Sequence, residues 1–172
     1  MAEPNEQVVL VDNEGKPVGS ADKATVHTTA TPLHLAFSCH VFDGEGRVLV
    51  TRRALAKATW AGVWTNSFCG HPTPGESVED AIARRARFEL GITVGELKLV
   101  LPDFRYRAVD ASGIVENEIC PVYRAVTTDA VVANPDEVSE WEWVDPVSLT
   151  AAASLAPYAF SPWLVWQLEQ LG

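Results

Sequence analysis

The stretch Gly70-His-Pro-Thr-Pro-Gly-Glu-Ser-Val-Glu-Asp-Ala-Ile-Ala-Arg-Arg-Ala-Arg-Phe-Glu-Leu-Gly91 joins a loop rich in glycine and proline to the strongest helix signal in the chain. Ser77 and Asp80 have the spacing of a capping box at a helix N-terminus. Gly91 stands where a left-handed residue ends a helix. The sequence therefore predicts a helix over 77–90, preceded by a structured loop over 58–75.

One narrow stripe of this helix, at about 100° per residue, mixes two apolar residues with two charged ones. The four residues are Val78, Ile82, Arg85 and Glu89. One interpretation is an Arg–Glu pair at i,i+4 on the margin of the stripe. The other is that the stripe faces a cavity, where the carboxylate and the guanidinium meet a ligand.

The segments on both sides of this helix predict more strands than helices. Strands are expected at 8–11, 35–43, 47–52, 64–69, 98–101, 104–108, 115–125 and 140–144, with closing helices at 146–153 and 161–171. The pattern indicates a single α+β domain over 1–172, in which mixed and antiparallel sheets are flanked by helices. Residues 1–7 are expected to be flexible.

The composition excludes several classes of protein. Of 172 residues, 13 are basic and 23 acidic, and a net charge of −10 disfavours non-specific binding to nucleic acid or anionic lipid. No segment reaches the roughly 18 apolar residues of a membrane helix. The three cysteines are too few and too odd in number for a disulfide framework. These features predict a cytoplasmic protein. We expect a monomer, with a homodimer as the alternative.

Two glutamates interrupt the apolar strand predicted at 115–125. Glu116 and Glu118 share one face at a period of two, so their like charges oppose each other. A solvent-facing side of the strand would explain the pair. A bound metal cation would explain it better, because the cation relieves the repulsion.

Three of the four histidines, His27, His34 and His71, lie in predicted loops or at strand edges. Imidazoles combined with two carboxylates make a ligand set suited to Zn, Mn or Mg. Scattered surface histidines are the alternative interpretation, since the spacing matches no common zinc motif. We interpret His40 as structural.

Cys69 precedes Gly70 and His71 in the predicted loop, where a glycine admits close approach of the backbone to a ligand. A buried, inert cysteine is the alternative interpretation. A neighbouring metal would favour the thiolate and thus its reactivity. Cys39 and Cys120 lie within predicted strands and are expected in the core.

The loop and helix resemble the Nudix box, a loop–helix–loop motif that holds divalent metal for diphosphate hydrolysis. The pattern Gx5Ex7RExxEExG is met at Gly70, Glu76, Arg84, Glu89 and Gly91. It is broken where Arg85 and Phe88 replace two glutamates that gather the metal ions. The break disfavours hydrolysis, while the rest of the motif predicts a Nudix-like fold.

Further motifs at 61–72, 103–107, 113–121 and 159–163 occur together with this broken box. With it they resemble type I isopentenyl diphosphate isomerases over nearly the whole chain. The resemblance implies interconversion of isopentenyl and dimethylallyl diphosphate in isoprenoid biosynthesis. Two other readings remain, a Nudix-type diphosphate hydrolase and a structural metal-binding module.

The resemblance also assigns roles to individual residues. One tightly bound divalent metal (Zn, Mn or Mg) is assigned to His27, His34, His71, Glu116 and Glu118. Catalysis is assigned to Cys69 and Glu118, assisted by Tyr106. One Mg²⁺ that accompanies the diphosphate is assigned to Glu89 and Cys69. Substrate binding is assigned to Arg53, Lys57, Arg85 and Trp163.

Overall fold

Helix α2 (Val78–Leu90) forms where the sequence predicts it in the computed structural model, which describes residues 6–172. The Ser77 side chain accepts a hydrogen bond of 3.0 Å from the backbone N–H of Asp80, and Gly91 ends the helix with a φ of 65°. Both caps engage backbone groups that have no partner within the helix. The capping residues thus set the length of the helix that borders the site.

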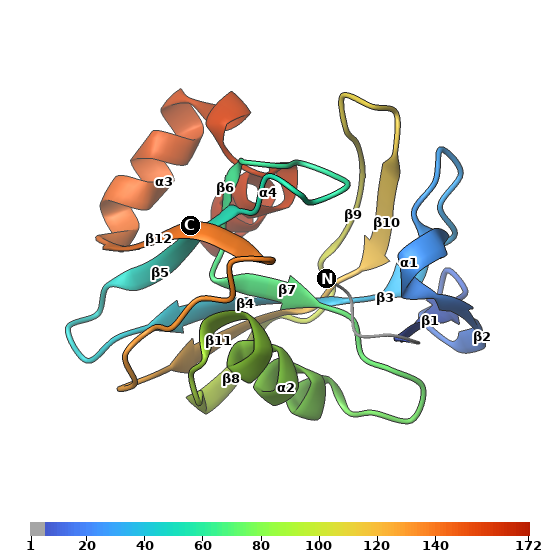
Figure 1. The fold of residues 1–172 in the computed structure, drawn as a ribbon, viewed down its shortest axis with the longest axis horizontal. Helices are drawn as coiled ribbons and strands as arrows, with labels where there is room; N and C mark the ends of the chain where they lie inside the picture. Colours follow the sequence, from blue (N-terminus) through green and yellow to red (C-terminus); the bar gives the residue numbers. More distant parts are fainter. Residues whose placement is uncertain (1–5) are drawn as a thin grey trace.

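Two sheets make up the rest of the architecture (Figure 1). The five-stranded sheet has the order β2-β1-β3-β10-β9, and the seven-stranded sheet has the order β12-β5-β4-β11-β8, with β6 on β5 and β7 on β4. The strands are β1 (Gln7–Val11), β2 (Pro17–Asp22), β3 (His34–Leu35), β4 (Phe37–Phe42), β5 (Val48–Arg53), β6 (Trp64–Thr65), β7 (Phe68–Gly70), β8 (Gly95–Leu101), β9 (Arg105–Val109), β10 (Val115–Ile119), β11 (Val122–Val126) and β12 (Val138–Val144).

The chain passes from one sheet to the other at two neighbouring points. The predicted strands 35–43 and 115–125 are each divided, into β3 and β4 at Ala36 and into β10 and β11 at Pro121. Proline has no N–H to continue a ladder, which gives a physical reason for the second division. Backbone bonds from Ala36 to Ile119 and from Ser38 to Pro121, at 2.9 and 3.1 Å, hold the two crossings side by side. Predicting single strands here was wrong.

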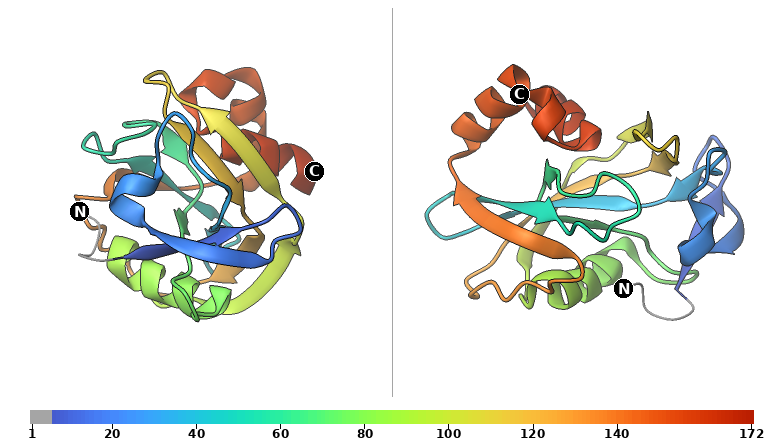
Figure 2. Two further views of the ribbon diagram at one scale, coloured as in Figure 1. Left: turned by 90° about the vertical axis from the view of Figure 1, so that its right-hand side faces the viewer. Right: turned by 45° about the horizontal axis from the view of Figure 1, so that its top comes forward.

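Helices cover both faces of the seven-stranded sheet, as Figures 1 and 2 show. On one face, the core between the sheet and α2 contains Phe37, Leu49 and Ile82. On the other face, α3 (Pro146–Leu155) and α4 (Pro162–Leu171) bury Leu149 and Leu164 against β5. The α+β class with mixed sheets flanked by helices is confirmed.

The N-terminal part contains elements that the sequence pattern did not predict. Strand β2 is almost entirely exposed and therefore lacks the alternation by which strands are recognised. Helix α1 (Lys23–Val26) has four residues, and the Asp22 side chain caps it. Of the start expected to be flexible, residues 1–5 lie outside the described residues, while Glu6 is buried and Gln7 begins β1.

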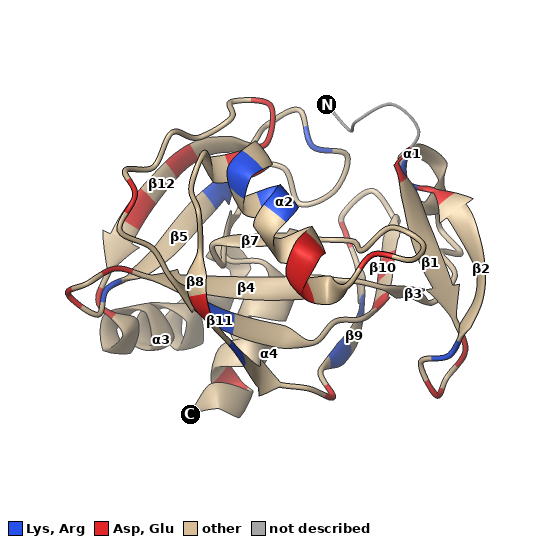
Figure 3. Ribbon diagram, turned by 90° about the horizontal axis from the view of Figure 1, so that it is seen from below, with Lys and Arg blue, Asp and Glu red and all other residues tan. Residues whose placement is uncertain are grey.

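Charge is distributed unevenly over the fold. Figure 3 shows Lys and Arg residues gathered on α2, while Asp and Glu residues are spread over many other elements. Helix α2 carries Arg84, Arg85 and Arg87 in succession with Ala86. Among residues 6–172, no helix has the length and apolar character required to cross a bilayer.

Candidate metal and diphosphate site

A cavity of about 550 Å³ lies between the two sheets and α2. Every residue that the sequence assigned to a site lines this cavity, with the exception of His34, which is fully buried beside it. The predicted residues come from separate parts of the chain, and the fold brings them together. Arg85 and Glu89 form the ion pair of the first interpretation of the α2 stripe, and both also line the cavity, as the second interpretation expects. That they meet a ligand there stays a prediction.

Three imidazoles and one carboxylate form a tight cluster at one wall. One ligand atom from each of His27, His34, His71 and Glu118 lies within 4.8 Å of the others. Glu116 adjoins this cluster, since its Oε2 lies 3.0 Å from Nε2 of His27. The register of the five-stranded sheet explains the arrangement, because His34 of β3 stands directly beside Glu118 of parallel strand β10.

The cluster has the properties expected of a divalent metal site. Nε2 of His27, Nε2 of His34 and Oε2 of Glu116 are buried without a hydrogen bond. Unsatisfied buried polar atoms are rare in proteins and call for a partner such as an ion. Nitrogen and carboxylate ligands of this kind suit Zn and related cations. The residues present therefore fit a metal.

Titration behaviour supports the same conclusion. Burial lowers the pKa of His71 to about 3, so its imidazole is neutral and able to act as a ligand. Burial alone would raise the pKa of Glu118, but the adjacent imidazoles of His34 and His71 outweigh it and hold that pKa well below its usual range. Burial and the charge of Glu118 raise the pKa of Glu116. A cation would stabilise both carboxylates in their charged forms.

Cys69 and Glu118 reach the cavity from different sheets. Cys69 lies on β7 of the seven-stranded sheet and Glu118 on β10 of the five-stranded sheet. Tyr106 donates a hydrogen bond of 2.9 Å from its hydroxyl to Oε2 of Glu118. Burial raises the pKa of Cys69 to about 12, which keeps the sulfur as a thiol in the absence of a cation. Cys39 and Cys120 are buried, as predicted.

Aromatic rings form the part of the cavity between these two walls. The Trp163 and Tyr106 ring centroids lie 5.7 Å apart, and the Arg53 Cζ lies 5.5 Å from the Trp163 ring. Trp60 packs edge-on against Trp163 at 5.2 Å. The arrangement places an electron-rich face beside the cavity, which favours positive charge near it.

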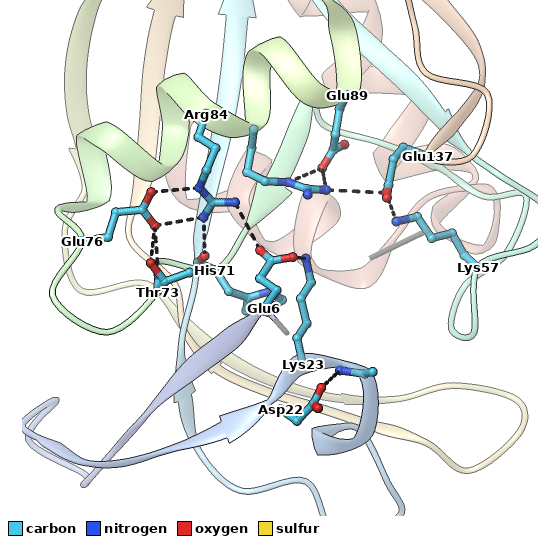
Figure 4. A network of polar contacts seen from close by, with 12 residues as sticks. Glu6, Asp22, Lys23, Lys57, His71, Thr73, Glu76, Arg84, Glu89 and Glu137 are labelled. Carbon is cyan, nitrogen blue, oxygen red and sulfur yellow. Dashed lines mark hydrogen bonds and ion pairs between the residues drawn. The ribbon is translucent and has the colours of Figure 1, made fainter. Parts of the chain in front are cut away.

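Two of the three basic residues predicted to bind a diphosphate, Lys57 and Arg85, are already paired with carboxylates, while Arg53 donates to the backbone oxygen of Thr59. Lys57 forms an ion pair with Glu137, and Arg85 contacts Glu89 at 2.5 Å and Glu137 at 3.6 Å (Figure 4). Arg85 nevertheless keeps a buried donor, because its Nη1 has no hydrogen-bond partner. The cavity therefore presents cations that are held in place by carboxylates.

Sequence reasoning missed three polar residues of this network. Lys23 of α1 lines the cavity, and buried Glu6 joins it at 2.8 Å, while Glu6 also contacts Arg84 at 3.2 Å (Figure 4). Glu137 is buried between Lys57 and Arg85. Each pairing joins residues far apart in the chain, so no local spacing could have revealed it.

Gly70 lines the cavity, and it also has a packing role that the sequence did not predict. A Cβ atom at this position would lie 2.7 Å from Cζ of Phe37 and 2.8 Å from Cγ of Arg85. The glycine therefore allows β7 and α2 to approach each other, and the close approach of the backbone is to protein atoms. Its effect on the cavity is to let the Arg85 side chain pass.

The fold is that of a NUDIX-domain protein, and the NUDIX domain family model matches residues 32–164. Within that class, the chain belongs to the isopentenyl-diphosphate Delta-isomerase family of enzymes. It is 63% identical to the isopentenyl-diphosphate Delta-isomerase of Leifsonia xyli, over 99% of this chain and 94% of the relative. It is 56% identical to that of Citrobacter koseri, over 94% of this chain and 90% of the relative.

Solved structures agree on the fold. A Deinococcus radiodurans protein matches with a TM-score of 0.74 and 20% identity, over 96% of this chain and 99% of its own. A MutT NUDIX hydrolase from Burkholderia pseudomallei matches with a TM-score of 0.63 and 24% identity, over 81% of this chain and 98% of its own. The expected Nudix-like fold is confirmed.

Proposed function

We propose that this protein interconverts isopentenyl diphosphate and dimethylallyl diphosphate. The observation that carries the proposal is the position of Cys69 and Glu118 on two different sheets that face one cavity. The high identity to the relatives named isopentenyl-diphosphate Delta-isomerase supports it. We further propose a cytoplasmic enzyme, monomeric or homodimeric, that does not act on nucleic acid.

Moving the double bond requires one carbon of an alkene to accept a proton and another carbon to lose one. Glu118, with the hydroxyl of Tyr106 bonded to it, is the group that we assign to one face of the substrate. Cys69 serves the opposite face, with its sulfur as the proton acceptor. The two roles exchange when the reaction runs in reverse.

The intermediate stage of this transfer has carbocation character at the tertiary carbon. The Trp163 face beside the cavity stabilises that charge, an interaction of about 2 kcal/mol or more when desolvated. The same ring packs against Tyr106 and Trp60, which keep it in one orientation. Because the pocket lies between sheets, it also shields the charge from water.

His27, His34, His71, Glu116 and Glu118 are the residues that we assign to a tightly bound divalent metal. When bound, the cation holds both carboxylates charged and raises the acidity of the groups that contact it. Protein residues alone set the position of Glu118, through its hydrogen bonds to His71 and Tyr106. Glu118 thus joins metal binding to proton transfer.

The diphosphate is anchored at the other end of the cavity. Arg53, Lys57 and Arg85 supply charge-assisted hydrogen bonds to phosphate oxygens. Glu89 is the carboxylate that we assign to the accompanying Mg²⁺, with Cys69 nearby. A Mg²⁺ ion neutralises phosphate charge and typically uses only one or two protein carboxylates.

Diphosphate hydrolysis is the alternative function, and the composition of α2 opposes it. Arg85 occupies a position where the hydrolase motif has a metal-binding glutamate, and its side chain is already paired with Glu89 and Glu137. A purely structural metal site would not explain why Arg53, Lys57 and Arg85 line the cavity. Neither alternative requires a cysteine at position 69.

A single assay separates these functions. The protein is incubated with isopentenyl diphosphate and Mg²⁺, and the products are separated from released phosphate. Formation of dimethylallyl diphosphate by the wild type, and its loss in Cys69→Ala, supports the proposal. Release of phosphate would support hydrolysis, and the absence of both products would support the structural module.

A further inference from the structure

Asn66 is fully buried beside the cavity. Its side-chain oxygen contacts both Cys69, which we assign to proton transfer, and Trp163, which we assign to stabilising the carbocation. Oδ1 accepts hydrogen bonds from the thiol of Cys69 at 3.4 Å and from the indole N–H of Trp163 at 3.2 Å. The hydroxyl of Thr65 donates to the same atom at 2.9 Å. One oxygen thereby fixes the cysteine relative to the aromatic ring.

The orientation of the Asn66 amide is determined by its nitrogen. Nδ2 donates to the backbone carbonyl oxygens of Cys39 at 3.1 Å and Phe68 at 2.8 Å. Carbonyl oxygens only accept, so the amide cannot be reversed and Oδ1 must face Cys69 and Trp163. Both carbonyls belong to strands of the seven-stranded sheet, which anchors the amide to a rigid element.

A second contact holds the sulfur of Cys69 from another direction. Ser38 Oγ lies 3.2 Å from Cys69 Sγ, and Gln167 donates to Ser38 Oγ at 2.9 Å. His40 in turn bonds Oε1 of Gln167 at 2.8 Å. Because Gln167 supplies a donor to Ser38, the hydrogen of the serine hydroxyl is available to a sulfur, either that of Cys69 or that of Cys120 at 3.4 Å, and the Cys69 sulfur is the nearer of the two.

We propose that Asn66 and Ser38 are positioning residues that hold the Cys69 sulfur against the substrate, with Asn66 also aligning Trp163. The inference rests on the proposed function, in which Cys69 exchanges a proton with the substrate. Neither residue lines the cavity, so they act through Cys69 and Trp163. A misplacement of about 1 Å in a reacting group costs about 10²-fold in rate, which is the size of effect available to such residues.

The test compares Asn66→Ala with Ser67→Ala. Ser67 is the adjacent residue and is equally buried, but its hydroxyl contacts only the backbone of Val41 and Leu49. Asn66→Ala should lower kcat by at least about tenfold with a smaller change in KM, since the hydrogen bonds of the Asn66 side chain go to none of the basic residues assigned to the diphosphate. Ser67→Ala should lower thermal stability and leave kcat intact.

Alkylation by iodoacetamide without substrate gives a readout that does not depend on turnover. Cys39 and Cys120 are buried, so modification reports the placement of Cys69, verified by mass spectrometry. Asn66→Ala and Ser38→Ala should change the alkylation rate of Cys69, whereas Ser67→Ala should not. If Asn66→Ala does not fold, Ser38→Ala decides, with a loss of kcat at unchanged KM expected.

Two results would overturn the inference. One is a folded Asn66→Ala, or Ser38→Ala in its place, with kcat and alkylation rate equal to those of Ser67→Ala. The other is a rise in KM together with a fall in kcat, if Ser67→Ala shows the same changes at equal stability. An inactive wild type would refute the proposed function instead, and the alkylation rates would still judge the placement of the sulfur.

Discussion

The guanidinium of Arg85 lies over the ring of Phe88, with Cζ 4.8 Å from the ring centroid. These are the two residues that replace glutamates of the Nudix box, and they pack against each other on α2. The exchange turns two negative positions into one positive and one apolar position. Arg85 then neutralises Glu89 and Glu137, which would otherwise be adjacent buried carboxylates.

Replacing Arg85 by glutamate should therefore unfold the site in the absence of metal. Arg85→Glu removes the buried cation that Glu89 and Glu137 share, although Glu137 keeps its ion pair with Lys57. Breaking a buried ion pair costs about 3–5 kcal/mol. We expect a lower Tm in EDTA, partly restored by Mg²⁺. Arg87→Glu, at an exposed position of the same helix, is the control and should change Tm little. Equal Tm values for the two variants in EDTA would contradict the role of Arg85.

The tight metal and the Mg²⁺ of the diphosphate should be separable. Protein purified without chelator should contain about one equivalent of divalent metal. His34→Ala should lose it, because His34 lies within the cluster, while Glu89→Gln should retain it and weaken Mg²⁺-dependent substrate binding. Metal analysis and substrate titration measure the two effects. Loss of the tight metal in Glu89→Gln would refute the division into two sites.

The two proposed proton-transfer groups should differ in their side effects. Removing one positioned acid or base typically costs about 10²–10⁴-fold, so Cys69→Ala and Glu118→Gln should each nearly abolish isomerisation. Cys69→Ala should keep the tight metal, and Glu118→Gln should weaken it. Cys39→Ala, at a buried strand position, should reduce stability more than rate. Substantial turnover by Cys69→Ala would exclude the two-face mechanism.

His40 gives a pH-dependent contribution to stability. Burial lowers the pKa of His40 from 6.5 to about 4. Between pH 4 and pH 6.5, the unfolded chain therefore binds a proton at His40 that the folded protein does not bind. The contribution is complete above pH 6.5 and is lost as the pH falls toward 4, by at most about 1.4 kcal/mol per pH unit. Urea denaturation at several pH values should show a shallower decline for His40→Gln. Identical slopes would show that His40 is protonated in the fold.

Gly70→Ala should be destabilising for steric reasons. The new Cβ would meet Phe37 and Arg85 at distances below 3.0 Å, and overpacking of this kind costs about 1–3 kcal/mol. Substrate binding should also weaken, because Arg85 must move. Gly44→Ala is the matched control, since a Cβ there would have no neighbour within 4 Å. Thermal melts and KM measure the two effects, and equal behaviour of the variants would contradict the steric argument.

Features that depend only on residues close together in the chain could be predicted from the sequence. The caps of α2 and the Glu116–Glu118 pair stand in short local patterns, so Ser77, Gly91 and the two glutamates were recognisable by spacing. The three histidines match no common zinc motif, and their assignment to one metal depended on the resemblance. The division at Pro121 depends on which sheet each half joins, and a continuous apolar run conceals it. Glu137 and Glu6 were missed because their partners lie far away in sequence.

Asn66 illustrates a different limit. The polar run Thr65-Asn66-Ser67 inside an apolar segment was a visible signal, since buried polar groups require partners. Its partners Cys69 and Trp163 become neighbours only when α4 packs against the sheet. Such a signal can indicate that a buried network exists, but the identity of its members depends on tertiary structure.

The two crossings between the sheets determine how the cavity can change. The chain is continuous through Ala36 and Pro121, and backbone hydrogen bonds join the two crossings to each other. The walls that carry Cys69 and Glu118 therefore cannot separate without breaking these bonds. An engineer who wants the enzyme to accept a longer hydrocarbon chain must shorten side chains that line the cavity, because the spacing of the walls is built into the backbone.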